Sequence, residues 1–378
     1  MSNGRLFGLD LVRAYAIVVV VHAHGYGYFA ETISLPIFLL PAVDGVTVFF
    51  VLSGFLIGGI LQGQTKEFLN FVSILDFWRR RWWRTLPTYY LVLSVLVGLE
   101  WWKGSPDWSD HFDYFLFLQN IAWPQPGFFS EAWSMPVEEW FYLLLPLIMF
   151  IHQEHYDKRG ARWVENNSLL KNTLSKSPWL LPILAVIGAC VTYRLIYVSV
   201  REVNTFIDWD QDLRKQVLPR LDSLMIGVLG AYVNKNYHKA WRQYANFGLV
   251  IAVILFLLDR CWLLLWPSQT YLNYWMLSLN PLMVLCCFPY ITALKCRSKM
   301  LVRLVTYISM VSYPLYLIHG TIVRNIVTKE EISLLNLSPM MGGWFSYIVY
   351  WLISIFLAFV IHEVFEKPMT AMRDRHAS

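Results

Sequence analysis

The sequence predicts an all-α protein that crosses a membrane about ten times, with both termini on the cytoplasmic side. Of its 378 residues, 57% are hydrophobic and only 15% are charged, whereas soluble domains are about 45–50% apolar and about 25% charged. Apolar runs of ~20 residues, long enough for a spanning helix, recur along the chain. Basic residues gather in alternate connections between these runs. This composition excludes a secreted disulfide scaffold, a nucleic-acid reader with a basic face, and a soluble α/β enzyme.

The ten predicted spans follow one another along the whole chain. In order they cover residues 8–28, 43–62, 84–102, 133–151, 179–199, 217–233, 246–265, 272–294, 303–325 and 340–363. The runs 45–65 and 332–362 contain no charged residue, which supports them. The weakest span is 217–233, because it contains Arg220 and Asp222. No small-residue cleavage site follows the first run, so we interpret it as a spanning helix and not as a signal peptide.

Lysine and arginine are divided unevenly between the two sets of connections. The set that includes both termini carries 21 of the 31 basic residues, and the alternate set carries six. Since basic loops stay on the cytoplasmic side, both termini are expected there. The polar segment 152–178 is predicted to be a cytoplasmic surface loop, and residues 364–378 a short cytoplasmic tail. Residues 1–378 are expected to form one transmembrane domain, with no fused second domain.

Ionisable side chains inside the first span are the main functional signal, because each costs at least ~2.5–3.5 kcal/mol to insert. At about 100° per residue, Arg13 and His24 fall on one face and Asp10 lies about 40° from His24. His22 points to the opposite face. The spacing therefore predicts a polar stripe of Asp10, Arg13 and His24 that runs from the cytoplasmic end into the outer half. The structural alternative is an interior salt bridge and an interfacial histidine.

An arginine cluster marks the cytoplasmic entrance of the third span. Arg81 and Arg84 are three residues apart and share one face of a helical turn, and Arg80 lies beside them. Guanidinium groups suit phosphate. Taken alone, however, the cluster is more typical of a stop-transfer signal or a patch for lipid headgroups.

Two further segments place polar groups in the outer half. Glu138 and Glu139 open the fourth span near the depth of His24, where a carboxylate could orient an imidazole. Glu139 is expected to favour the helix N-terminus as a capping acid, whereas both roles stay open for Glu138. His319 lies in the outer half of its span, either as a core histidine or, with Ser53 and Trp133, as part of a substrate cavity.

Taken in order, these segments resemble the acyltransferase 3 family of polytopic membrane acyltransferases, from about residue 7 to residue 367. The blocks that carry the resemblance are residues 9–24, 48–56, 77–87, 133–146, 312–319 and 365–368. Each block is weak alone, but the ordered set is fairly specific. The resemblance implies ten helices and an acyl-CoA donor, usually acetyl-CoA, used from the cytoplasmic side. It also implies an acceptor hydroxyl on a cell-surface glycan or lipid-linked sugar, and a bacterial inner membrane.

The resemblance also suggests roles for single residues. The family's essential histidine and arginine fall on His24 and Arg13, and its helix-four glutamate falls on Glu138. Its paired arginines fall on Arg81 and Arg84. Relatives often carry aspartate where this chain has Thr47, with Asp44 three residues earlier, so the role of that acid is open here.

The resulting hypothesis is O-acyl transfer. Arg80, Arg81 and Arg84 would hold the phosphates of the donor, and its arm would follow the Asp10 stripe. His24 would deprotonate the acceptor hydroxyl or briefly take the acyl group, with its tautomer held by Glu138. No metal is expected, because the five cysteines lie in or beside apolar runs without a paired motif. One alternative is a transporter or flippase for a lipid-linked sugar or small solute, but the sequence shows no inverted repeat of the kind that transporters often have. The other alternative is a non-catalytic membrane scaffold.

Overall fold

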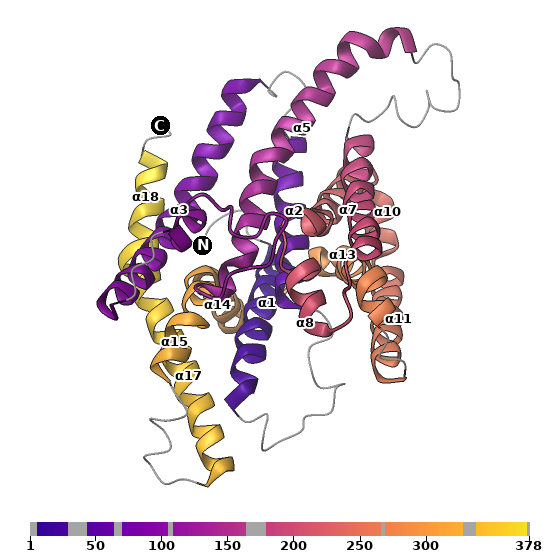
Figure 1. Cartoon of the computed structure of the whole chain (residues 1–378). Helices are drawn as coiled ribbons and strands as arrows, with labels where there is room; N and C mark the ends of the chain where they lie inside the picture. The colour runs from indigo at the N-terminus through magenta and orange to yellow at the C-terminus, as the bar shows by residue number, and fades with distance from the viewer. Residues whose placement is uncertain are drawn as a thin grey trace.

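The computed structural model describes residues 6–28, 44–63, 70–104, 109–163, 179–265, 269–327 and 338–375, and this part of the chain is helical without strands (Figure 1). The all-α prediction is therefore confirmed. The elements are α1 (Phe7–Gly25), η1 (Tyr26–Tyr28), α2 (Gly45–Gly63), α3 (Phe71–Trp102), α4 (Ser109–Phe115), η4 (Ser130–Trp133), α5 (Ser134–Trp163), α7 (Leu180–Val200), α8 (Phe206–Trp209), η6 (Asp210–Arg214), η7 (Leu218–Arg220), α9 (Leu221–Asn236), α10 (His238–Gln243), α11 (Ala245–Leu265), α12 (Gln269–Tyr271), η8 (Leu272–Met276), α13 (Leu277–Ala293), α14 (Lys299–Ile318), α15 (Thr321–Ile326), α17 (Pro339–Ile361), η9 (His362–Glu366) and α18 (Lys367–Arg375).

Eight helices in the described part of the chain are long and apolar enough to cross a membrane, and they match eight of the ten predicted spans. The other two predictions, 84–102 and 217–233, fall on α3 and α9. Helix α3 is 32 residues long, but its first half carries the arginine cluster. Helix α9 has only 16 residues, which is about 24 Å at 1.5 Å per residue. Most of its residues are buried, as expected for a helix enclosed by its neighbours.

One predicted loop is wrong where the structure describes it. The predicted loop 152–178 begins as helix, because α5 continues without a break to Trp163. The predicted tail 364–378 is helical as far as Arg375, because η9 and α18 continue α17 and α18 packs against α3. Residues 164–178 and 376–378 lie outside the described residues, as do Lys66 and Lys329 of the charge count.

Helices α2 and α9 are in close contact because glycine lies at their crossing. A Cβ atom on Gly54 would lie 1.8 Å from the carbonyl oxygen of Leu224, and one on Gly227 would lie 2.2 Å from that of Val51. Neither position can hold a larger side chain without a shift of backbone. Small residues of this kind allow close approach of membrane helices. The contact fixes α2, which contributes Ser53 to the cavity described below.

The acidic residue of the weakest predicted span, Asp222, belongs to a buried ion pair with Arg194. Arg194 of α7 lies 2.8 Å from Asp222 of α9, and the two side chains are 2% and 1% exposed. Arg194 also donates to the carbonyl oxygen of Pro219 (2.7 Å) and to Ser278 Oγ (2.6 Å). These bonds compensate for burial of the charges and join α7, α9 and α13.

Candidate active site

Helix α1 turns its polar stripe toward α14. The hydroxyl of Ser309 on α14 donates to Oδ1 of Asp10 (2.9 Å) and accepts from Nη1 of Arg13 (3.3 Å). Asp10 and Arg13 are themselves 3.9 Å apart. Their contact is the interior ion pair that the sequence allowed, and it leaves Arg13 at the wall of a cavity.

The same face of α1 carries His24, which contacts His319, the residue directly after the end of α14. Nδ1 of His24 lies 2.8 Å from Nε2 of His319, and the two ring centroids are 4.9 Å apart. His22 instead contacts the hydroxyl of Tyr347 on α17, at 2.8 Å from its Nδ1. The contacts therefore separate the two histidines of α1 as the face calculation predicts.

His319 is fully buried and tied to the end of α14. Its Nδ1 lies 2.7 Å from the carbonyl oxygen of Tyr316 and 3.1 Å from that of Leu315. The last carbonyls of a helix lack partners within the helix, and the ring of His319 supplies one here. Its orientation is thereby fixed from the side opposite His24.

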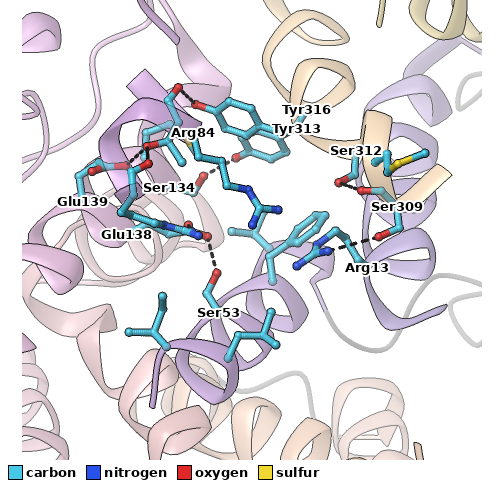
Figure 2. Close-up of a pocket in the computed structure, with 18 of the residues that line it drawn as sticks. Arg13, Ser53, Arg84, Ser134, Glu138, Glu139, Ser309, Ser312, Tyr313 and Tyr316 are labelled. Atoms are coloured by element: carbon cyan, nitrogen blue, oxygen red, sulfur yellow. Dashed lines mark hydrogen bonds and ion pairs between the residues drawn. The ribbon is translucent and has the colours of Figure 1, made fainter. Parts of the chain in front are cut away.

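A cavity of about 250 Å³ lies among α1, α2, α3, α5, α14 and η9 (Figure 2). Its polar lining residues are Arg13, Ser53, Arg81, Arg84, Thr85, Ser134, Glu138, Glu139, Ser309, Ser312, Tyr313, Tyr316 and Glu366. Of the three residues predicted to line a substrate cavity, only Ser53 lines this one. Trp133 is buried and its ring packs under the guanidinium of Arg214, 4.9 Å from the centroid. His319 lies behind Tyr316, with ring centroids 5.8 Å apart.

The ring of Tyr316 separates the cavity from the two histidines. Its hydroxyl donates to the carbonyl oxygen of Glu131 (2.7 Å) and accepts from Ser134 Oγ (2.7 Å). Sequence reasoning missed Tyr313 and Tyr316, although they stand six and three residues before His319 and therefore recur at helical spacing on α14. The block 312–319 thus contributes to both the cavity and the histidine pair.

Glu138 does not orient His24, and that hypothesis is wrong. Its carboxylate accepts from the hydroxyls of Tyr142 and Ser53 and lies 3.6 Å from Nη2 of Arg81. Among the described residues, the ring of His24 is instead hydrogen-bonded to the ring of His319. Glu138 lies on the cavity wall because Ser134 to Glu139 form the first turns of α5.

Glu139 is also a cavity residue, not a capping acid. It lies beyond the first turn of α5, and its Oε1 accepts from Thr85 Oγ1 of α3 at 2.9 Å. Its other carboxylate oxygen is buried without a hydrogen-bond partner in the described residues. Glu366 reaches the same cavity from η9. The block 365–368 was the one sequence signal for Glu366.

The three clustered arginines have different surroundings. Arg81 donates to the hydroxyl of Tyr142, and its guanidinium lies over that ring, 4.0 Å from the centroid. Arg84 has no hydrogen-bond partner among the residues that the structure describes, and it points into the cavity toward Arg13 (Figure 2). Arg80 is exposed and does not line the cavity. The predicted pair is thus divided, because Arg81 already has acidic and phenolic partners.

A second charged cluster lies at the start of α2. Arg214 is 2.9 Å from Asp44 and also pairs with Asp210, which lies 2.6 Å from Lys215 Nζ. Burial favours the neutral acid of Asp210, but the charges of Arg214 and Lys215 outweigh it and lower the pKa of that carboxyl. Asp44, whose role the sequence left open, is therefore an ion-pair partner.

Thr47, whose position the family resemblance singled out, accepts a hydrogen bond from Nη2 of Arg220 at 2.7 Å and therefore faces a cation. In the described part of the chain, no group of three or more His, Cys, Asp or Glu side chains is placed to hold a metal ion.

The model of the family described as "Acyltransferase domain" matches residues 6–363. The chain is 27% identical over 179 residues to the peptidoglycan O-acetyltransferase OatA of Listeria monocytogenes, which covers 43% of this chain and 26% of that protein. It is 29% identical over 161 residues to the putative peptidoglycan O-acetyltransferase YrhL of Bacillus subtilis, covering 38% and 24%.

A third relative is the O-acetyltransferase OatA of Staphylococcus aureus, which is 26% identical over 166 residues, covering 38% of this chain and 24% of that protein. The matched segment thus spans about a quarter of the length of each curated relative. No solved structure matches the chain.

Proposed function

Since the chain belongs to the family described as "Acyltransferase domain", we propose that it transfers an acyl group, in the simplest case acetyl, from acyl-CoA to a hydroxyl of a carbohydrate or lipid-linked glycan. The donor would enter from the cytoplasmic side and the acceptor from the outer face. The relatives are named for O-acetylation of peptidoglycan, which supports a glycan of the cell envelope as acceptor. The distribution of basic residues supports cytoplasmic termini, and the bacterial relatives support the inner (cytoplasmic) membrane of a bacterium.

One observation carries the proposal: a polar cavity lies next to a histidine pair, with only the ring of Tyr316 between them. Arg84 points into this cavity and has no hydrogen-bond partner among the described residues. Arg84 and Arg13 are placed as expected for side chains that receive an anionic donor (Figure 2). Arginine binds phosphate through parallel N–H donors. Tyr316 at the far wall lies against His319, which contacts His24. A donor with its charged end at Arg84 would have its thioester directed toward Tyr316 and the histidines behind it.

The transfer itself breaks a C–S bond and forms a C–O bond. His24 takes the proton of the acceptor hydroxyl as its oxygen attacks the thioester carbonyl. The C–S bond then breaks, and the leaving thiolate takes the proton from His24 to give free CoA and the ester. The reaction requires no oxidant or reductant. A general base of this kind contributes about 10²–10⁴-fold to a rate.

The test uses purified protein in detergent with [¹⁴C]acetyl-CoA and a soluble glycan acceptor. We expect labelled ester to form with the wild-type chain, and His24→Ala to lower its rate by about 10²–10⁴-fold. His22→Ala is the matched control, because His22 faces α17 and not the histidine pair. Equal rates for wild type and His24→Ala would overturn the proposal. Movement of a lipid-linked sugar across vesicles without label transfer would favour the transporter alternative.

A further inference from the structure

We propose that His319 is the positioning residue of the reaction: by accepting a hydrogen bond from Nδ1 of His24, it keeps Nε2 of His24 unprotonated and available as the base. The proposal rests on the proposed function for its role in transfer. The tautomer itself follows from contacts alone.

The protonation of His319 is fixed first. Its Nδ1 lies 2.7 Å from the carbonyl oxygen of Tyr316 and 3.1 Å from that of Leu315. A carbonyl oxygen only accepts hydrogen bonds, so Nδ1 of His319 must carry a hydrogen. A neutral imidazole has one protonated nitrogen, and Nε2 of His319 is therefore a bare acceptor.

The protonation of His24 follows from that of His319. Its Nδ1 lies 2.8 Å from the bare Nε2 of His319. Two lone pairs facing each other at this distance repel, so Nδ1 of His24 must carry a hydrogen and donate it. In neutral His24 the remaining lone pair is then on Nε2. In a histidine site, the hydrogen bond made by one ring nitrogen sets which nitrogen carries the proton, and the other nitrogen is then free for the chemistry.

The arrangement resembles the logic of a Ser-His-Asp triad, in which a buried carboxylate holds the tautomer of a catalytic histidine. Here the partner is a neutral ring that is itself held by the backbone of α14. His319 is fully buried, so its side of the bond is shielded from water.

The tautomer is read directly by ¹⁵N NMR of protein labelled at histidine, at a pH where the imidazoles are neutral. The His24 signals are assigned by subtraction of the His24→Gln spectrum. We expect Nδ1 of His24 to be protonated and Nε2 bare in the wild type. In His319→Leu the preference should weaken, and the carbonyl oxygen of Val20 on the same helix is then the remaining acceptor for the ring of His24. In His319→Gln, whose carbonyl oxygen accepts at a similar reach, it should return. His22→Leu is the matched control and should leave it unchanged.

Activity gives a second readout. His319→Leu should lower kcat by about 10²-fold or more with KM for acetyl-CoA unchanged, and His319→Gln should recover much of kcat. A wild-type spectrum with the proton of His24 on Nε2 overturns the inference, and so does a His319→Gln protein that is folded but no more active than His319→Leu. If His319→Leu fails to fold, the wild-type spectrum still shows which nitrogen of His24 carries the proton and so tests the inference. A wild type with the expected tautomer but no acyl transfer would overturn the proposed function and leave the tautomer inference standing.

Discussion

His24 and His319 are separated by 295 positions in the chain, yet their Nδ1 and Nε2 atoms lie 2.8 Å apart. The contact exists because α1 and α14 pack side by side, with Asp10 and Arg13 bound to Ser309 farther along the same seam. One helix pair therefore holds both the cation at the cavity wall and the imidazole at the end of the seam.

Arg84 should contribute to donor affinity, whereas Arg80 should not. Arg84 lines the cavity without a hydrogen-bond partner in the described residues, and Arg80 is exposed away from it. Hydrogen bonds to charged groups are worth about 1.5–3 kcal/mol, so Arg84→Ala should raise KM for acetyl-CoA by roughly 10–100-fold. Its melting temperature should stay near that of the wild type. Arg80→Ala is the control, and an equal rise in KM for both variants would contradict the assignment.

Gly54 should not tolerate a methyl group. A Cβ there would lie 1.8 Å from the carbonyl oxygen of Leu224, so α2 and α9 would have to move apart. Overpacking of this kind costs about 1–3 kcal/mol or more. Gly59→Ala is the matched control on the same helix, because no atom of a neighbouring element in the described residues lies within 4 Å of the position its Cβ would take. Thermal unfolding in detergent should show a lower midpoint for Gly54→Ala and an unchanged or higher one for Gly59→Ala.

The buried pair of Arg194 and Asp222 should be costly to break and cheaper to replace. Arg194→Met leaves the Asp222 carboxylate buried without its cation, which costs about 3–5 kcal/mol. Arg194→Met combined with Asp222→Leu removes both charges and should recover much of that loss. The measurement is the thermal unfolding midpoint of the two variants. A double variant less stable than Arg194→Met would show that the pair has a further role.

The pair of Asp210 and Arg214 should make stability depend on pH in the acid range. The pKa of Asp210 is lower in the folded chain than in the unfolded chain, where it is about 3.9. The ionised carboxylate therefore stabilises the fold above about pH 4, and this contribution is lost as the pH falls through the folded pKa. Asp210→Asn should lower the melting temperature at pH 7, and the difference from wild type should close as the pH falls through the lowered pKa of Asp210. A difference that is constant with pH would contradict this account.

The sequence located the polar face of α1 because a helix has a fixed angle per residue. Asp10, Arg13 and His24 had to share a face whatever that face met. The sequence does not identify what lies opposite, and similar depth in the membrane was the only sequence feature that favoured Glu138 as the partner of His24. In the structure Glu138 contacts Arg81, Ser53 and Tyr142.

The arginine cluster shows the same limit. Spacing placed Arg81 and Arg84 on one side of α3, but only packing against α5 gives Arg81 its partners and leaves Arg84 facing the cavity. Glu366 lies 353 positions after Arg13 and reaches the same cavity through η9. No periodicity within one segment predicts a contact of that separation.

Long apolar runs in the sequence predict the all-α membrane architecture and the position of most spans, and the ionisable residues within them mark the candidate chemistry. They can do so because burial in lipid demands long apolar helices, so each ionisable residue among them stands out. Which of these residues meet depends on how helices distant in sequence pack, because that packing sets the hydrogen-bond partners of each side chain. It joins His24 to His319, ties Glu138 to Arg81 and leaves Arg84 facing the cavity.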